Sequence, residues 1–172
     1  MLYSKPIVAL RFILLLCFSF ACLQLIAQNK NSAYQLHIRK ATSPIVVDGE
    51  MNEEAWLNAD VAKSFWQMLP MDTSRALVPT EVRMTYDNVN LYIIATCYKA
   101  KQVSYMVESL RRDWNFGKND NFIFCLDPFE DRTNGLTFGA NAAGAQYDGM
   151  LYEGGSNNLN WDNKWISSVK NY

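Results

Sequence analysis

The chain has 172 residues, with 16 Lys and Arg against 17 Asp and Glu, so its formal net charge is −1. No basic run or stripe is present, which argues against nucleic acid or an anionic membrane surface as an electrostatic partner. The single histidine, His37, argues against a histidine-based triad or a zinc site built from several histidines of this chain.

The first 27 residues have the pattern of a cleavable signal peptide. Lys5 and Arg11 come before an apolar run at residues 12–27, which is too short and too interrupted for a membrane span of about 20 residues. Cleavage after Ala27 would leave residues 28–172 as one exported domain, located in the periplasm or associated with the outer membrane. The alternative is an uncleaved membrane anchor.

Residues 45–59, IVVDGEMNEEAWLNA, place an acidic cluster directly after a β-branched run. The pattern predicts a short strand in IVV, a DG turn, and then a short helix with Asn52 as its N-cap. Glu53 and Glu54 would lie in the first helical turn, where carboxylates interact well with the helix dipole. A catalytic pair would need two carboxylates that converge across a cleft, and successive positions on one exposed turn do not converge. The cluster is therefore interpreted as a helix start, with Trp56 packing the helix against the sheet.

Apolar residues alternate with a period of two through most of the remaining chain. Turn signals separate the alternating runs, among them DNVN at residues 87–90 and Gly144 in AAG. The expected strands lie at residues 80–86, 91–98, 121–127, 135–141, 145–152 and 165–170. Many short strands of this kind predict an all-β fold, an antiparallel, jelly-roll-like β-sandwich with one short helix near the N-terminus.

Two cysteines, Cys97 and Cys125, remain after the predicted cleavage, and both fall in expected strands. An oxidising envelope compartment would permit a disulfide between them. Two buried free thiols are equally consistent with the sequence, because it does not give the separation of the two Cα atoms.

Four segments, in the right order, resemble the family 9 carbohydrate-binding modules. They are VVDGEMNEEAW, VRMTYDNVNLYIIATCY, DNFIFCLDPFED and FGANAAGAQYDG, and the likeness covers residues 44 to about 170. It is nearest to a branch found at the N-terminus of larger bacterial envelope proteins. The resemblance implies non-catalytic carbohydrate binding linked to carbohydrate catabolism, an oligo- or polysaccharide as partner, and a further envelope domain on the C-terminal side.

The resemblance also implies a binding site. Binding members of the family hold a terminal sugar between two tryptophans. One of these stands just before a strand that begins and ends with Asp, which corresponds here to Asp120–Asp127 and is called the Asp-to-Asp strand. Trp114 has that place here, and Arg112, Asp113 and Asn115 beside it are candidates to hydrogen-bond sugar hydroxyls. In the alternative, Trp114 packs over the sheet edge and Arg112 pairs with a carboxylate.

A second candidate surface is YEGGSNNLNWDNKW, in which Trp161 is a possible platform and Trp165 is expected to anchor the core. If both lay on one strand, about 13 Å would separate them along it.

Three positions depart from the family pattern. The acidic residue in the middle of the Asp-to-Asp strand falls on Ile123, and the arginine of the next strand falls near Gly139. The second platform tryptophan would lie beyond Tyr172, so the chain is interpreted as a family 9-like sandwich lacking its last strands. The alternative function is a structural or interaction domain of an envelope protein that retains no sugar site. An exposed Trp114 would favour the first function, and a buried one the second.

No cofactor is expected, and a structural calcium ion is the alternative. Hard oxygen ligands suit Ca²⁺, and family members often contain it. The candidate ligands are Asp127, Glu130, Asp131 and Asp148, although no EF-hand-like spacing connects them.

Overall fold

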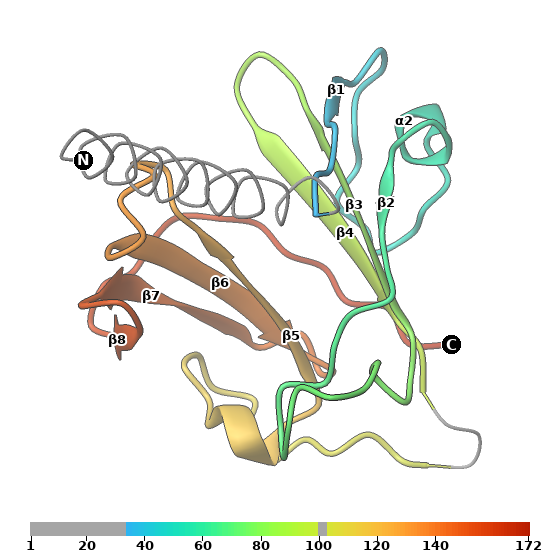
Figure 1. The fold of residues 1–172 in the computed structure, drawn as a ribbon. Helices are drawn as coiled ribbons and strands as arrows, with labels where there is room; N and C mark the ends of the chain where they lie inside the picture. Colours follow the sequence, from blue (N-terminus) through green and yellow to red (C-terminus); the bar gives the residue numbers. More distant parts are fainter. Residues whose placement is uncertain (1–33, 100–102) are drawn as a thin grey trace, which may run out of the picture. The chain divides into compact units, whose positions relative to one another are not determined.

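The computed structural model describes residues 34–99 and 103–172, and Ile38–Tyr172 form one compact unit. The predicted signal peptide, residues 1–27, lies outside the described residues. Within the unit, the strands form two four-stranded sheets, and the described helices are short (Figure 1). The prediction of an all-β, sandwich-like fold is therefore confirmed.

The first sheet is built around β3 (Thr80–Tyr86). β4 (Leu91–Cys97) pairs with β3 along its whole length in antiparallel register. The short strands β1 (Arg39–Lys40) and β2 (Val61–Ala62) also pair with β3, β1 parallel and β2 antiparallel. The predicted strands on either side of DNVN thus form one hairpin.

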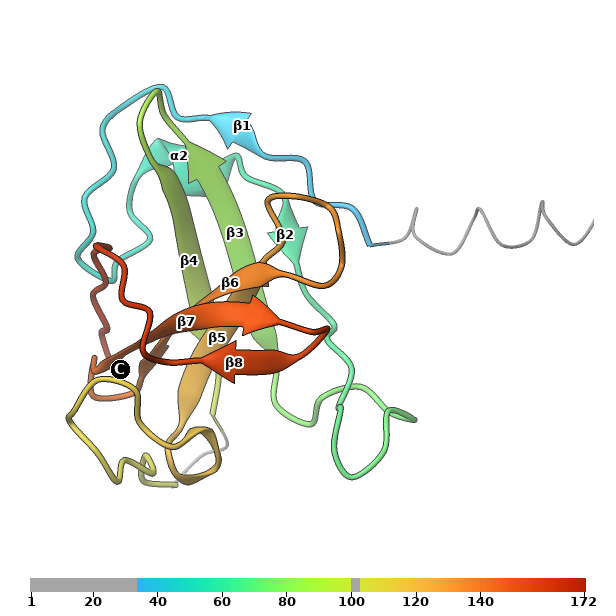
Figure 2. The same ribbon diagram turned by 90° about the vertical axis from the view of Figure 1, so that its left-hand side faces the viewer.

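The second sheet is a continuous antiparallel meander in the order β5-β6-β7-β8. Its strands are β5 (Asn121–Leu126), β6 (Gly135–Asn141), β7 (Gln146–Tyr152) and β8 (Ser156–Asn158). Gly144 closes the β6–β7 turn with φ +85°, a conformation that favours glycine. Figure 2 shows β7 and β8 running across the direction of β3 and β4. The predictions for β5, β6 and β7 are confirmed to within one residue at each end.

The segment at residues 45–59 differs from the prediction in two details. Residues 45–47 form no strand, and the helix α2 (Glu54–Leu57) has Glu53 rather than Asn52 as its N-cap residue. Glu53 makes no side-chain cap; instead, its Oε1 accepts a hydrogen bond from the Val46 N–H at 2.9 Å. The carboxylate therefore holds the preceding extended segment, in which Val46 and Val47 are exposed and not buried in a sheet. Trp56 is buried, as expected.

The expected last strand is also absent, since residues 159–172 run without regular structure after β8. Contacts along its length hold this segment, and two of them lie towards its end. Trp165 packs edge-on against Phe138 of β6, with ring centroids 5.5 Å apart, and Lys170 forms an ion pair with Glu50. Gly49 permits the close approach at this point: it has φ +85°, and a Cβ there would lie 3.1 Å from the Lys170 Cβ. The turn at Asp48–Gly49 thus packs against the last residues of the chain (red in Figure 1).

Cys97 on β4 and Cys125 on β5 belong to different sheets, and both are free and exposed. No disulfide joins them, so the free-thiol alternative describes this structure, with the difference that the thiols are not buried. None of the described helices has the length and apolar character to cross a membrane.

Candidate functional site

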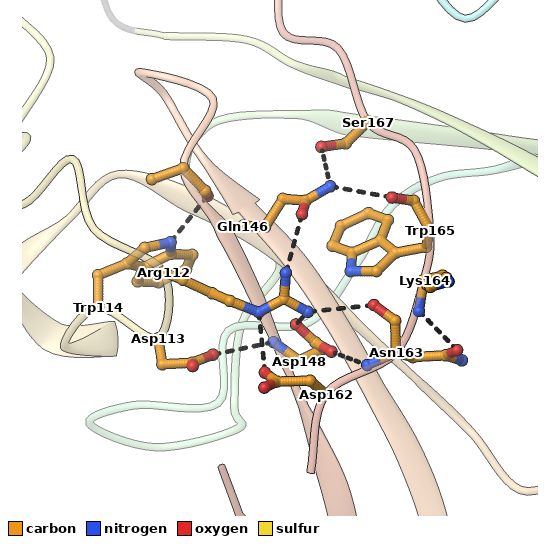
Figure 3. Close-up of polar contacts among 11 residues, drawn as sticks. Arg112, Asp113, Trp114, Gln146, Asp148, Asp162, Asn163, Lys164, Trp165 and Ser167 are labelled. Atoms are coloured by element: carbon orange, nitrogen blue, oxygen red, sulfur yellow. Dashed lines mark hydrogen bonds and ion pairs between the residues drawn. The ribbon is translucent and has the colours of Figure 1, made fainter. Parts of the chain in front are cut away.

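Arg112 lies at the centre of a polar network that joins three parts of the chain (Figure 3). Its guanidinium forms an ion pair with Asp148 of β7, whose side chain is 0 % exposed, and its Nε lies 3.1 Å from Asp162 Oδ1. It also donates hydrogen bonds to Gln146 Oε1 at 3.1 Å and to the Asn163 carbonyl oxygen at 3.2 Å. One arginine therefore connects the loop before η1 (Phe116–Lys118), strand β7 and the last segment.

The network continues through backbone groups. The Asn163 N–H donates to Asp148 Oδ2 at 2.7 Å, and the Asp148 N–H donates to Asp113 Oδ1 at 3.3 Å. Partial burial raises the pKa of Asp113, although Arg112 acts in the opposite direction. Burial also opposes the charge on Arg112, but Asp148 outweighs it and the pKa of the guanidinium is raised. Asp148 thus stabilises the charge of Arg112, whereas burial disfavours the charge of Asp113.

Trp114 is buried, with 3 % of its surface exposed. Its Nε1–H donates to the Ala145 carbonyl oxygen at 2.8 Å, and its ring lies 5.1 Å from that of Tyr147 at a tilt of 41°. Trp114 is therefore not an exposed stacking platform. The structure shows the alternative, in which Trp114 packs on the protein and Arg112 pairs with a carboxylate. The hydrogen bond to the β6–β7 turn and the packing on Tyr147 hold the indole within the protein.

Asn115 and Trp161 also contact protein groups. The Asn115 Oδ1 accepts a hydrogen bond from the Gly117 N–H at 3.0 Å and so caps η1. Trp161 is half-buried and meets Phe138 edge-on, with centroids 6.4 Å apart. Since Trp165 contacts the same phenyl ring, the two tryptophans converge on Phe138 and do not extend along a strand.

The structure thus brings Arg112 and Asp113 together around Asp148 and places Trp114 beside them, on another side of the same loop (Figure 3). Asn115 and Trp161 do not join this cluster.

The candidate calcium ligands are separated. Asp148 is paired with Arg112, whereas Asp127 and Asp131 close the β5–β6 turn through hydrogen bonds from N–H groups, such as Arg132 N–H to Asp127 Oδ2 at 2.8 Å. Hydrogen bonds from Asn134 hold the pKa of Asp131 well below its usual range. The side chain of Asn134 contributes most, followed by its backbone N–H. Over residues 34–99 and 103–172, no three or more Asp, Glu, His or Cys side chains are grouped so as to hold a metal ion.

An open hollow of about 520 Å³ lies elsewhere, between the start of β5, η1 and the segment after β2. The phenyl rings of Phe65 and Phe116 and the side chain of Met106 are exposed there. Polar groups stand beside them: Asp120 Oδ2 accepts a hydrogen bond from the Met106 N–H at 2.9 Å, and the Asn121 amide donates to the Phe116 carbonyl oxygen at 3.0 Å. The remaining lining residues are Thr80, Gly117, Asn119, Phe122 and Ile123.

Sequence reasoning did not find this hollow. Phe116 lies two residues after Trp114, the aromatic residue that the family resemblance singled out, and Phe65 lies about fifty residues earlier. The sequence signal that was available is the aromatic pair Phe65–Trp66 between expected strands, outside any alternating run.

Comparisons of the chain with protein-family models, with curated proteins and with solved structures found no match. The resemblance to family 9 carbohydrate-binding modules therefore stays an expectation from the sequence.

Proposed function

We propose that this chain is a non-catalytic carbohydrate-binding module of an exported protein that takes part in carbohydrate catabolism. The observation that supports this function best is the hollow, where Phe65 and Phe116 are exposed beside Asp120 and Asn121. Sugars present apolar C–H faces and a rim of hydroxyls, so flat aromatic rings next to fixed amide and carboxylate oxygens match their chemistry.

The polar groups of the hollow are held in place before any ligand arrives. Asp120 and Asn121 each make a hydrogen bond to the backbone of a neighbouring lining residue. Groups that are already oriented lose little conformational entropy on binding, which favours affinity. The hollow is open and its rings are phenyl groups, so we expect binding in the micromolar to millimolar range, roughly −8 to −4 kcal/mol.

The test is a glycan array followed by isothermal titration calorimetry with the sugars that respond, using the parent chain and Phe116→Ala. Loss of the stacking ring should weaken binding at least about fivefold, since aromatic contacts contribute about 1 kcal/mol beyond burial. The matched control is Phe129→Ala, which removes another exposed phenyl ring, from the β5–β6 turn. If Phe129→Ala weakens binding as much as Phe116→Ala, the sugar is not held in the hollow.

The second candidate is a structural or interaction domain of an envelope protein without a sugar site. The burial of Trp114 and the pairing of Arg112 with Asp148 and Asp162 support it, because the residues that resemble a sugar site are engaged with the protein. A chain that circular dichroism shows to be folded, but that responds to no glycan, would favour this candidate over the first.

A further inference from the structure

Residues 63–77 form a narrow hairpin-like loop between β2 and β3, which we call the arm. The green loop that extends beyond the ends of β2 and β3 in Figure 2 is this segment. Two backbone hydrogen bonds close its neck, from Ala76 N–H to Phe65 O at 2.8 Å and from Gln67 N–H to Ser74 O at 2.9 Å. The neck is therefore held as a short ladder, with a turn at its far end.

The turn carries four consecutive apolar residues, Met68, Leu69, Pro70 and Met71, which we call the tip. Met68 is 84 % exposed, Leu69 75 % and Met71 64 %. A run of exposed apolar side chains costs free energy in water and has no packing role, so it indicates an interaction surface. The neck places the tip beyond the ends of β2 and β3 (Figure 2). A partner of the tip therefore has to contact a protruding loop and not a flat surface.

The neck differs in chemistry from the tip. Phe65 and Trp66 are exposed aromatic residues, and the guanidinium of Arg75 stands 4.2 Å from the centre of the Trp66 ring. Arg75 also donates to the Ser64 carbonyl oxygen. Aromatic rings and long cationic side chains are the groups that prefer the boundary between lipid headgroups and acyl chains.

The distance between these two zones fits a bilayer surface. Three residues of extended chain separate Trp66 from Leu69, which is about 10 Å. Apolar surfaces of interfacial proteins enter the headgroup and acyl boundary by about 5–10 Å. With Trp66 at the headgroup level, the aliphatic tip therefore reaches the first part of the acyl chains.

We propose that the arm is a lipid-insertion loop, whose tip enters one leaflet of a bilayer while Trp66 and Arg75 remain at the interface. The partner is the lipid surface itself. The arm carries two cations, Lys63 and Arg75, and one anion, Asp72. A net charge of only +1 gives little attraction to anionic lipid, so insertion depends on apolar burial. Phe65 belongs both to the hollow and to the neck, but the inference rests on the tip, Trp66 and Arg75, none of which lines the hollow.

The test uses the full chain and vesicles of phosphatidylcholine, with and without added phosphatidylglycerol. The variant combines Met68→Ser, Leu69→Ser and Met71→Ser, and the matched control is Leu77→Ser, an apolar residue that is 89 % exposed on the body side of the neck. Flotation measures binding, and circular dichroism checks the fold. Quenching by brominated acyl chains, taken as the difference between the parent and Trp66→Phe, reports Trp66 alone, so any binding by the N-terminal segment is separated.

We expect Trp66 to be quenched in the parent and in Leu77→Ser, equally with both lipid mixtures, and the triple variant to lose this quenching. The triple variant should bind vesicles at least about tenfold more weakly, because each removed side chain contributes apolar burial. Absence of Trp66 quenching in the parent would overturn the proposal. Quenching that survives in the triple variant, or that needs phosphatidylglycerol, would overturn it as well. If the tip substitutions change only self-association, the partner of the tip is protein and the proposal is wrong.

Discussion

Arg112 forms an ion pair with Asp148, a carboxylate whose side chain is completely excluded from solvent. The arginine comes from the loop before η1, and Asp148 lies on β7 directly across from Phe138. Asp162 and the Asn163 backbone, from the last segment, bind the same pair. The ion pair therefore connects the loop before η1, strand β7 and the last segment, which are not neighbours in a sheet.

The first prediction concerns this pair. Arg112→Met should lower the free energy of unfolding by about 3 kcal/mol, because it leaves the buried charge of Asp148 without a partner. Adding Asp148→Asn should recover part of the loss, since the double variant no longer buries an unpaired charge. Urea unfolding of the single and double variants measures both effects. An unchanged midpoint for Arg112→Met would show that the ion pair adds no stability.

Trp114 is predicted to act on stability. Trp114→Ala should cost about 3–5 kcal/mol, as for other large buried side chains, whereas Trp114→Phe keeps a ring and loses the hydrogen bond to Ala145, at about 1–3 kcal/mol. Thermal unfolding of both variants checks the order of the losses. As a control, Trp66→Ala removes an exposed indole and should cost about 1 kcal/mol or less. Equal costs at the two tryptophans would contradict the buried role of Trp114.

Gly139 lies directly across from Ile123 in the β5–β6 ladder. A Cβ at position 139 would come within 2.5 Å of Ile123 Cγ1 and 2.8 Å of the Phe122 carbonyl oxygen. Gly139→Ala should therefore destabilise by about 1–3 kcal/mol, although alanine is normally the better strand residue. Gly117→Ala is the control, because its Cβ would meet only Asn115 Oδ1, at 3.6 Å. Denaturant unfolding of both variants measures the change in the free energy of unfolding. If Gly139→Ala leaves it unchanged, β5 and β6 can move apart without cost.

The turn between β3 and β4 predicts a pH dependence. Asp87 accepts hydrogen bonds from the Val89 and Asn90 N–H groups, each at 2.7 Å, and from the Tyr92 hydroxyl at 2.8 Å. These bonds, the Val89 and Asn90 ones first, lower the pKa of Asp87 from 3.8 to about 2. Between these values the folded state binds fewer protons than the unfolded state, so the stabilisation by Asp87 is complete above about pH 4 and is lost as the pH falls to about 2.

The measurement is the difference in unfolding midpoint between the parent and Asp87→Asn across this pH range. The parent should be the more stable at neutral pH, and the difference should shrink towards pH 2. Asp72→Asn removes a carboxylate from the exposed arm and controls for net charge. A difference that stays constant with pH would show that the charge of Asp87 makes no contribution.

The main strands were predictable because their pattern is local. In β3 to β7, side chains alternate between two faces, and the turn residues at 87–90 and Gly144 need only their own backbone conformation. Trp56 as an anchor was predictable for the same reason, since one large apolar residue follows directly after an acidic helix start.

The candidate site was predictable only in part. Resemblance singled out Arg112, Asp113 and Trp114, and the structure does place them together. Their partners were hidden, because Asp148 lies 36 residues after Arg112 and Asp162 lies 50 residues after it. An aromatic residue in a loop has the same sequence signature whether it faces solvent or packs on a neighbour such as Tyr147.

The sequence by itself determined the all-β class, the hairpins and the helix start, because period-two alternation, turn residues and helix-start carboxylates act over a few residues. Only the tertiary structure decided that Trp114 is buried, that Arg112 pairs with Asp148, and that Phe65 and Phe116 line one hollow. Burial and charge pairing depend on which distant segments meet. That meeting is the outcome of packing the whole chain, so no short stretch of sequence encodes it.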